Sequence, residues 1–185
     1  MRAPRREHLL DTAEALFSKE GFKGVSVDRL LNEAGVAKMT LYKGFESKNA
    51  LILETLRRRA VRLAAHMETC LAKAGPTPQE QLLSCFDGMR EWSTRPDFNG
   101  CYFINALGEY AGTDSEVAKI VNIYKAGFLD RLEELCSACG VENSAGFAKS
   151  MLLLIDGAVT AHMTLNDHDS YERAKNIARI LLHQG

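Results

Sequence analysis

Apolar residues recur every three or four positions along almost the whole chain, which is the spacing of one face of a helix. No stretch shows the period-two alternation of a half-buried strand, and no internal repeat is present. The pattern predicts helices over residues 5–20, 27–34, 37–45, 48–73, 78–93, 101–111, 115–139, 145–165 and 171–183. We therefore expect an all-α protein, with a small three-helix N-terminal head and a larger helical body.

Several helix ends carry clear capping signals. Ser26 and Ser47 stand at N-cap positions, and Gly35 is placed to end the helix that Ser26 begins. Thr77 is followed by a proline and has Glu80 three residues on, which is a capping box after a Gly-Pro break. A turn is expected at residues 112–114. These signals fix the ends of the predicted helices more closely than periodicity alone.

The net charge of −1 conceals two halves of opposite sign. Residues 1–62 hold 13 Lys and Arg against 8 Asp and Glu, a balance of +5, whereas residues 63–185 hold 10 against 16. Such asymmetry indicates that the N-terminal part meets an anionic partner. Charge alone does not distinguish this interpretation from a solvated basic face.

Composition places the chain among ordinary globular proteins, with 46% hydrophobic and 25% charged residues. The N-terminus lacks the apolar run of a signal peptide, and the apolar run at residues 151–155 stops at Asp156, far short of a membrane span. Five cysteines are an odd number, which favours reduced thiols. We expect a cytoplasmic protein with no membrane partner.

The two short helices predicted between residues 27 and 45 fit a helix-turn-helix, in which Gly35 allows the sharp turn. In the second helix, Leu41 and Phe45 form one apolar anchor, and the other side chains are small, basic or hydrogen-bonding. This mixture is typical of a recognition helix in a DNA major groove. Lys48 opens the next helix, where free backbone N–H groups favour anions. The alternative is an ordinary helical hairpin with a polar face.

One ordered set of residues carries a specific resemblance. It runs Leu16-Phe17, Gly21-Phe22, Val25-Ser26-Val27, Leu30, Ala34-Gly35-Val36, Thr40-Leu41-Tyr42, Phe45, Ser47-Lys48 and Leu51. This set resembles the DNA-binding domain of the TetR (tetracycline repressor-like) family of bacterial transcription regulators. The resemblance implies a DNA-binding domain over residues 1–47 and a ligand-binding and dimerisation domain over residues 48–185. It also implies a homodimeric repressor that a small-molecule inducer releases from a palindromic double-stranded DNA operator.

The resemblance also assigns residues to DNA. Those it implies are Ser26, Lys38, Met39, Thr40, Tyr42, Lys43 and Lys48. Residues 38–40 would lie in the groove, while Thr40, Tyr42 and Lys48 would hold phosphates and Ser26 would touch the backbone with Arg5 and Arg6. Gly44 departs from the family, which usually has an aromatic residue or His there. The departure removes one phosphate contact, and we expect Lys43 to compensate for it with a phosphate contact of its own.

The body offers candidates for an inducer pocket and for a dimer interface. Aromatic, Met and a few polar residues give the pocket set Phe86, Met89, Arg90, Trp92, Phe103, Glu109, Tyr124, Phe128, Met151 and Asp156. Small and apolar residues of the last two helices give the interface set Leu154, Gly157, Ala158, Ala161, Leu165, Ile177, Ala178 and Leu181. Most residues of an aromatic stripe belong to a core, so packing is the alternative role of the pocket set.

Cysteines support two alternative functions. Cys101 lies near the start of a helix in a segment that resembles one branch of the family, and a thiol there is a candidate electrophile or oxidant sensor. Its alternative role is that of a small buried hydrophobe. Cys136 and Cys139 have the spacing of a thiol enzyme or metal pair, but they lack a strand scaffold and further ligands. His162 and His168 complete no metal site, so we expect no metal, no cofactor and no enzyme activity.

Overall fold

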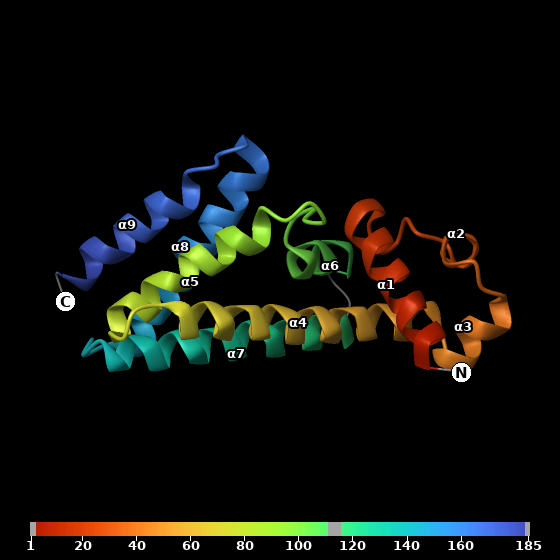
Figure 1. Cartoon of the computed structure of the whole chain (residues 1–185), viewed down its shortest axis with the longest axis horizontal. Helices are drawn as coiled ribbons and strands as arrows, with labels where there is room; N and C mark the ends of the chain where they lie inside the picture. Colours follow the sequence, from red (N-terminus) through yellow and green to blue (C-terminus); the bar gives the residue numbers. More distant parts are fainter. Residues whose placement is uncertain (1–2, 111–115, 184–185) are drawn as a thin grey trace. The chain divides into compact units, whose positions relative to one another are not determined.

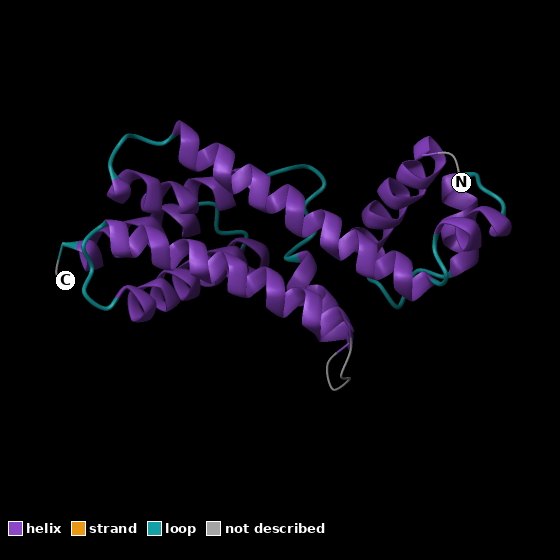
Figure 2. Cartoon of the chain, turned by 90° about the horizontal axis from the view of Figure 1, so that it is seen from below, coloured by secondary structure: helices purple, strands orange, loops and turns teal. Residues whose placement is uncertain are grey.

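The computed structural model describes residues 3–110 and 116–183, and within these ranges the chain forms helices and loops without strands (Figures 1 and 2). The helices are α1 (Ala3–Glu20), α2 (Val27–Ala34), α3 (Lys38–Gly44), α4 (Lys48–Lys73), α5 (Pro78–Ser93), α6 (Tyr102–Tyr110), α7 (Glu116–Ala138), α8 (Ser144–Leu165) and α9 (Ser170–Leu182). The expected all-α class is confirmed. The turn expected at residues 112–114 lies outside the described residues.

Side-chain caps explain why the helices begin where the sequence predicts. The hydroxyl of Ser26 accepts the Arg29 N–H at 3.0 Å, and the hydroxyl of Ser47 accepts the Ala50 N–H at 3.0 Å. At α5, Thr77 and Glu80 form the reciprocal capping box in full. Each cap satisfies N–H groups that a helix start leaves without an intrahelical partner, which fixes the first turn.

The chain packs as two compact units. One unit comprises residues 1–61 and 97–122, and the other comprises residues 62–96 and 123–185. Both α4 and α7 pass from one unit into the other. Packing therefore groups α6 and the first half of α4 with the N-terminal helices, whereas the functional division expected after residue 47 remains a prediction.

Aromatic side chains from distant parts of the sequence build the core of the first unit. The rings of Phe17 and Phe22 stack with centroids 5.4 Å apart, and Tyr102 of α6 meets Phe22 edge-on at 4.8 Å. All three side chains are almost completely buried. The Tyr102 hydroxyl donates a hydrogen bond to the Thr55 hydroxyl at 3.0 Å, so α6 and α4 are joined inside this unit.

A buried ion-pair cluster also ties α1 to α4. The two carboxylate oxygens of Glu14 lie 2.9 Å from the Arg59 guanidinium and 3.0 Å from that of Arg58. Glu14 and Arg59 are both buried, while Arg58 extends to Asp11 at 2.7 Å on the surface. Charge-assisted bonds of this kind are directional and fix how the two helices are aligned.

In the second unit, α8 and α9 pack against each other and both contact α5. Fully buried side chains fill the space between these helices: Leu82, Phe86, Met151, Ile155, Tyr171 and Ala178. Lys175 of α9 pairs with Asp87 of α5 at 2.6 Å, and Arg131 of α7 pairs with Glu68 of α4 at 3.0 Å. Within the described ranges, no helix combines the length and apolar character needed to cross a bilayer.

Candidate nucleic-acid interface

The turn between α2 and α3 has the geometry of a helix-turn-helix. Gly35 adopts a left-handed conformation, with φ 60° and ψ 33°, that disfavours residues with a Cβ atom. Its N–H reaches the carbonyls of Leu31 and Asn32, and the Val36 N–H bonds the Leu31 carbonyl at 3.1 Å. These bonds end α2 in a glycine cap and redirect the chain into α3.

The short helix α3 is anchored on one side and open on the other. Leu41 is 0% exposed and the adjacent cap residue Phe45 is buried, whereas Met39 is 64% and Tyr42 is 46% exposed. The Phe45 N–H bonds the Leu41 carbonyl at 2.7 Å, so the helix closes normally despite Gly44 at its end. An exposed Met and Tyr on a seven-residue helix form a surface suited to a partner rather than to a core.

The charges around α3 divide into paired arginines and unpaired lysines. Arg29 of α2 pairs with Glu20 and Glu33, and Arg6 of α1 pairs with Glu54 at 3.0 Å. By contrast, Lys38 and Lys43 of α3 are exposed and form no ion pair with any described residue. The other residues assigned to DNA lie nearby in the chain, with Ser26 exposed as the α2 cap and Thr40 half-buried. Uncompensated positive charge in this unit is therefore available on the outer face of α3.

Lys48, assigned to a phosphate by the resemblance, is directed toward the protein. Its Nζ donates to the Lys23 carbonyl at 3.5 Å and lies 5.9 Å from the centre of the Phe17 ring. Burial lowers the pKa of the Lys48 ammonium, and the nearby Glu109 carboxylate partly offsets this effect. A phosphate contact by this residue requires the ammonium to leave these neighbours, and that contact remains a prediction.

Glu109 holds the loop between α1 and α2. Its carboxylate accepts the backbone N–H of Phe22 at 2.8 Å and that of Lys23 at 2.5 Å. At Gly21, where φ is +81°, a Cβ atom would lie 2.9 Å from the same carboxylate, so glycine leaves room for it. Glu109, expected from the sequence to line the ligand pocket, has this contact instead, and no local pattern signals a partner 87 residues away.

The other residues of the predicted pocket set are distributed between the two units. Phe103 belongs with Glu109 to the first unit and is buried there. In the second unit Phe86, Met89, Trp92 and Met151 are buried, Tyr124 and Phe128 are half-buried, and Arg90 is exposed. Asp156 is bound to the Lys125 ammonium at 2.6 and 2.8 Å. The buried members serve the core in this structure, and their contact with a ligand remains a prediction.

The cysteines selected from the sequence occupy different environments. Cys101 directly precedes α6, is partly exposed, and accepts the Asn105 N–H at 2.9 Å through its carbonyl. Its role as a sensor remains a prediction. Burial raises the pKa of the Cys136 thiol to about 11 and also raises the pKa of Cys139. Both shifts disfavour the thiolate, whereas a dithiol active site needs a thiol of lowered pKa.

The sequence profile described as bacterial regulatory proteins of the tetR family matches residues 9–55, which span α1, the helix-turn-helix and the start of α4. A crystal structure of a TetR-family transcriptional regulator from Streptomyces coelicolor superposes on the whole chain and on 91% of its own, with a TM-score of 0.92 and 28% identity. Residues 9–55 therefore form a DNA-binding domain of the TetR family, and the whole chain has the fold of a TetR-family regulator. It is accordingly a DNA-binding transcriptional regulator.

The chain is also similar to curated HTH-type transcriptional regulators. It is 20% identical over 178 residues to the transcriptional regulator YjdC of Escherichia coli, covering 96% of this chain and 93% of YjdC. It is 37% identical over 78 residues to the transcriptional repressor KstR of Mycolicibacterium smegmatis, covering 42% and 38% of the two chains. The reduced form of Escherichia coli NemR has the same fold, with a TM-score of 0.83, 21% identity and 95% coverage of both chains.

Proposed function

We propose that this TetR-family protein is a homodimeric repressor that binds a palindromic operator through α3 and is released by a small molecule bound in the body. The observation that carries the DNA-binding face is the pair of exposed, unpaired lysines on a helix anchored by Leu41. Lys38, Met39 and Thr40 enter the major groove, and Tyr42 and Lys43 contact phosphates on either side. Two α3 helices spaced by one turn of B-DNA, about 34 Å, read the two half-sites.

The first test compares operator and unrelated DNA in Lys38→Ala and Tyr42→Ala variants. Lys38→Ala is expected to lose about 1–3 kcal/mol of discrimination between the two duplexes, because a base contact carries sequence information. Tyr42→Ala is expected to weaken binding to both duplexes alike, because phosphate contacts are independent of sequence. Fluorescence anisotropy at several salt concentrations measures both effects, with operator DNA taken from upstream of the gene or selected from random sequences.

Lys19→Ala is the matched control, because Lys19 is an exposed lysine of α1 with no ion pair among the described residues. It should leave affinity, discrimination and salt dependence close to wild type, whereas Lys43→Ala should reduce the slope of log K against log salt by about one. Equal losses from Lys19→Ala and Lys43→Ala would show only a general charge effect. The assignment of α3 to the groove would then be wrong.

The dimer is supported by an exposed apolar surface on α8 and α9. Leu153 and Leu165 are each 74% exposed, and Ile177 and Ile180 are also open to solvent. Of the residues assigned to the interface from the sequence, Leu154, Gly157, Ala161, Leu165, Ile177 and Leu181 retain exposed area, but Ala158 and Ala178 are buried. Those two pack within the protomer, so the proposed interface excludes them and takes in Leu153 and Ile180.

Ile177→Glu is expected to convert the dimer to a monomer, because a charge on an apolar interface loses its hydration without gaining a partner. Sedimentation equilibrium measures the association state. Ile123→Glu is the control, since Ile123 is an exposed isoleucine of α7 outside the α8–α9 surface. A dimer that withstands Ile177→Glu would place the interface elsewhere. The monomer should also bind a full operator far more weakly than a dimer, since it reads one half-site.

The proposed inducer site lies in the second unit, among the aromatic and Met side chains of α5, α7 and α8. Half-buried Tyr124 and Phe128 supply apolar surface in the same unit as the buried Phe86 and Met151. The Lys125–Asp156 pair supplies polar groups on the same two helices, α7 and α8. This combination suits a largely apolar molecule with one polar group. Ligand binding lowers operator affinity only by the difference in its affinity for the two conformations.

A further inference from the structure

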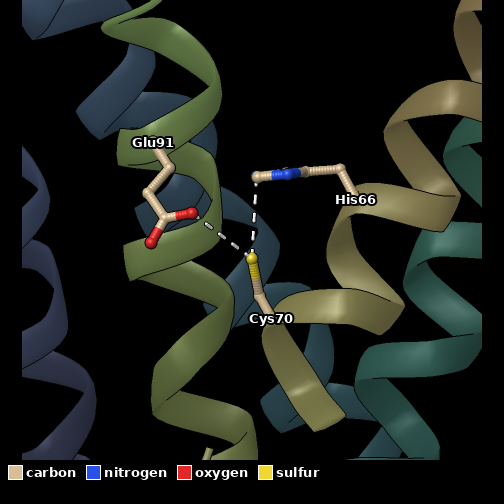
Figure 3. Close-up of side chains that lie close together, drawn as sticks. All are labelled: His66, Cys70 and Glu91. Atoms are coloured by element: carbon tan, nitrogen blue, oxygen red, sulfur yellow. Dashed lines mark hydrogen bonds between the residues drawn. The ribbon is translucent and has the colours of Figure 1, made fainter. Parts of the chain in front are cut away.

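Three potential metal ligands meet between α4 and α5 within the second unit (Figure 3). His66 and Cys70 lie one turn apart on α4, and Glu91 extends toward them from α5. The Cys70 sulfur is 3.6 Å from His66 Nε2 and 3.8 Å from a Glu91 carboxylate oxygen. Among the described residues, no other trio of His, Cys, Asp or Glu brings its ligand atoms as close together.

Gly88 allows the two helices to approach each other at this point. A Cβ atom on Gly88 would lie 3.0 Å from the Met67 sulfur and 3.1 Å from the Cys70 sulfur. The His66 ring is positioned by the Gly88 carbonyl, which accepts its Nε2 proton at 2.9 Å, and by the neighbouring Trp92 ring at 5.5 Å. A larger residue at position 88 would therefore push Cys70 and α5 apart and separate the three side chains.

The three ligand atoms all lie within 4.8 Å of one another, and the two separations at the Cys70 sulfur match the coordination of a borderline-soft cation. Zinc bonds sulfur at about 2.3 Å and nitrogen or oxygen at about 2.0 Å, so tetrahedral ligands lie about 3.5 Å apart. The observed separations of 3.6 and 3.8 Å at the sulfur are close to this value. A thiolate with an imidazole selects zinc-like ions over calcium or magnesium, which prefer oxygen ligands.

We propose that His66, Cys70 and Glu91 bind one divalent cation of the zinc class, with a water molecule or an exogenous ligand in the fourth position. On binding, the Cys70 thiol gives up its proton to solvent and the sulfur bonds the metal. The neutral His66 ring carries its proton on Nδ1 instead of Nε2, and the freed Nε2 bonds the metal in place of the Gly88 carbonyl. The thiolate and the carboxylate balance the charge of the cation.

This site is independent of DNA binding, so its test needs no operator. Reduced, metal-free full-length protein is titrated with Co²⁺, which reports thiolate ligation through charge-transfer absorption and tetrahedral geometry through visible bands. We expect one equivalent to bind, with both signals, and one equivalent of Zn²⁺ to remove them. Zn²⁺ should also raise the melting temperature in proportion to its binding. Saturation without the charge-transfer band would overturn the proposal.

Variants identify the ligands. Cys70→Ser is expected to abolish the charge-transfer band, and His66→Gln and Glu91→Gln to weaken Co²⁺ binding by more than the roughly 10–100-fold caused by loss of an outer-shell partner. Cys139→Ser is the matched control, since Cys139 is a partly exposed thiol outside the trio, and it should keep the full spectrum. Circular dichroism confirms that each variant is folded. A band that persists in Cys70→Ser or disappears in Cys139→Ser would refute the assignment.

Discussion

Replacing Glu14 with glutamine is expected to lower the free energy of unfolding by about 3–5 kcal/mol, the usual cost of removing one partner from a buried ion pair. Glu14 is buried and binds Arg58 and Arg59 with one oxygen each. Glutamine retains one acceptor oxygen but carries no charge, and Arg59 is itself buried. The guanidinium would then keep its desolvation cost while losing the nearer of its carboxylate partners, since Asp97 lies 3.9 Å away.

Denaturant unfolding followed by circular dichroism measures this loss. Asp11→Asn is the matched control, because Asp11 also pairs with Arg58 but its side chain is 65% exposed. Its loss should stay below about 1 kcal/mol, as for other surface pairs. If the two variants lost the same stability, burial would not be what makes the Glu14 pairs important. Glu14→Leu keeps a similar side-chain volume but removes both the charge and the hydrogen bonds. It should therefore destabilise the protein at least as much as Glu14→Gln.

Replacing Glu109 with alanine is expected to destabilise the first unit by about 2–3 kcal/mol. Hydrogen bonds to a charged group contribute about 1.5–3 kcal/mol each, and this carboxylate accepts two backbone N–H groups. Because the site is partly exposed, water can accept hydrogen bonds from the two amides and reduce the loss of stability. The loop that opens leads into α2 and its cap at Ser26, so operator affinity should fall together with stability.

Native-state hydrogen exchange locates this effect. The amides of Phe22 and Lys23 should exchange much faster in Glu109→Ala, because they lose the acceptor that protects them. Glu109→Gln provides the comparison, since it keeps one carbonyl acceptor and should give an intermediate rate. Unchanged exchange at both amides would show that the carboxylate does not hold the loop in solution. A function of Glu109 in ligand binding alone would then regain support.

The helix ends were predictable because their causes are local. Ser26, Ser47 and Thr77 each cap a helix through a hydrogen bond that spans only three residues, and the structure contains all three bonds. Gly35 likewise adopts the left-handed cap that its position after α2 indicated. The exposed face of α3 followed from the same logic, since one apolar anchor at Leu41 determines which side chains point outward.

Contacts between segments that are distant in the sequence could not be predicted from local patterns. The Glu14–Arg59 pair spans 45 residues and the Glu109 contact spans 87, so no periodicity or spacing connects the partners. His66 and Cys70 do carry a local signal, because an i,i+4 pair of soft ligands shares one helix face. Glu91, the third residue of the proposed site, lies on α5, and only the packing of α5 against α4 brings it close to the other two. Aromatic composition also failed to separate core from pocket, since Phe86 and Met151 are fully buried.

The discontinuity of the first unit has a consequence for how the protein is made. Its N-terminal segment, residues 1–61, leaves the ribosome well before residues 97–110, which supply Tyr102 and Glu109. Until those residues are made, the nascent helix-turn-helix lacks the Tyr102 ring that packs against Phe22. The Phe22 and Lys23 amides also lack the Glu109 carboxylate that accepts their hydrogen bonds. The same dependence constrains the exchange of DNA-binding modules between related regulators. A transferred segment that ends within α4 lacks the contacts of Tyr102 and Glu109, whereas one that includes α6 retains them.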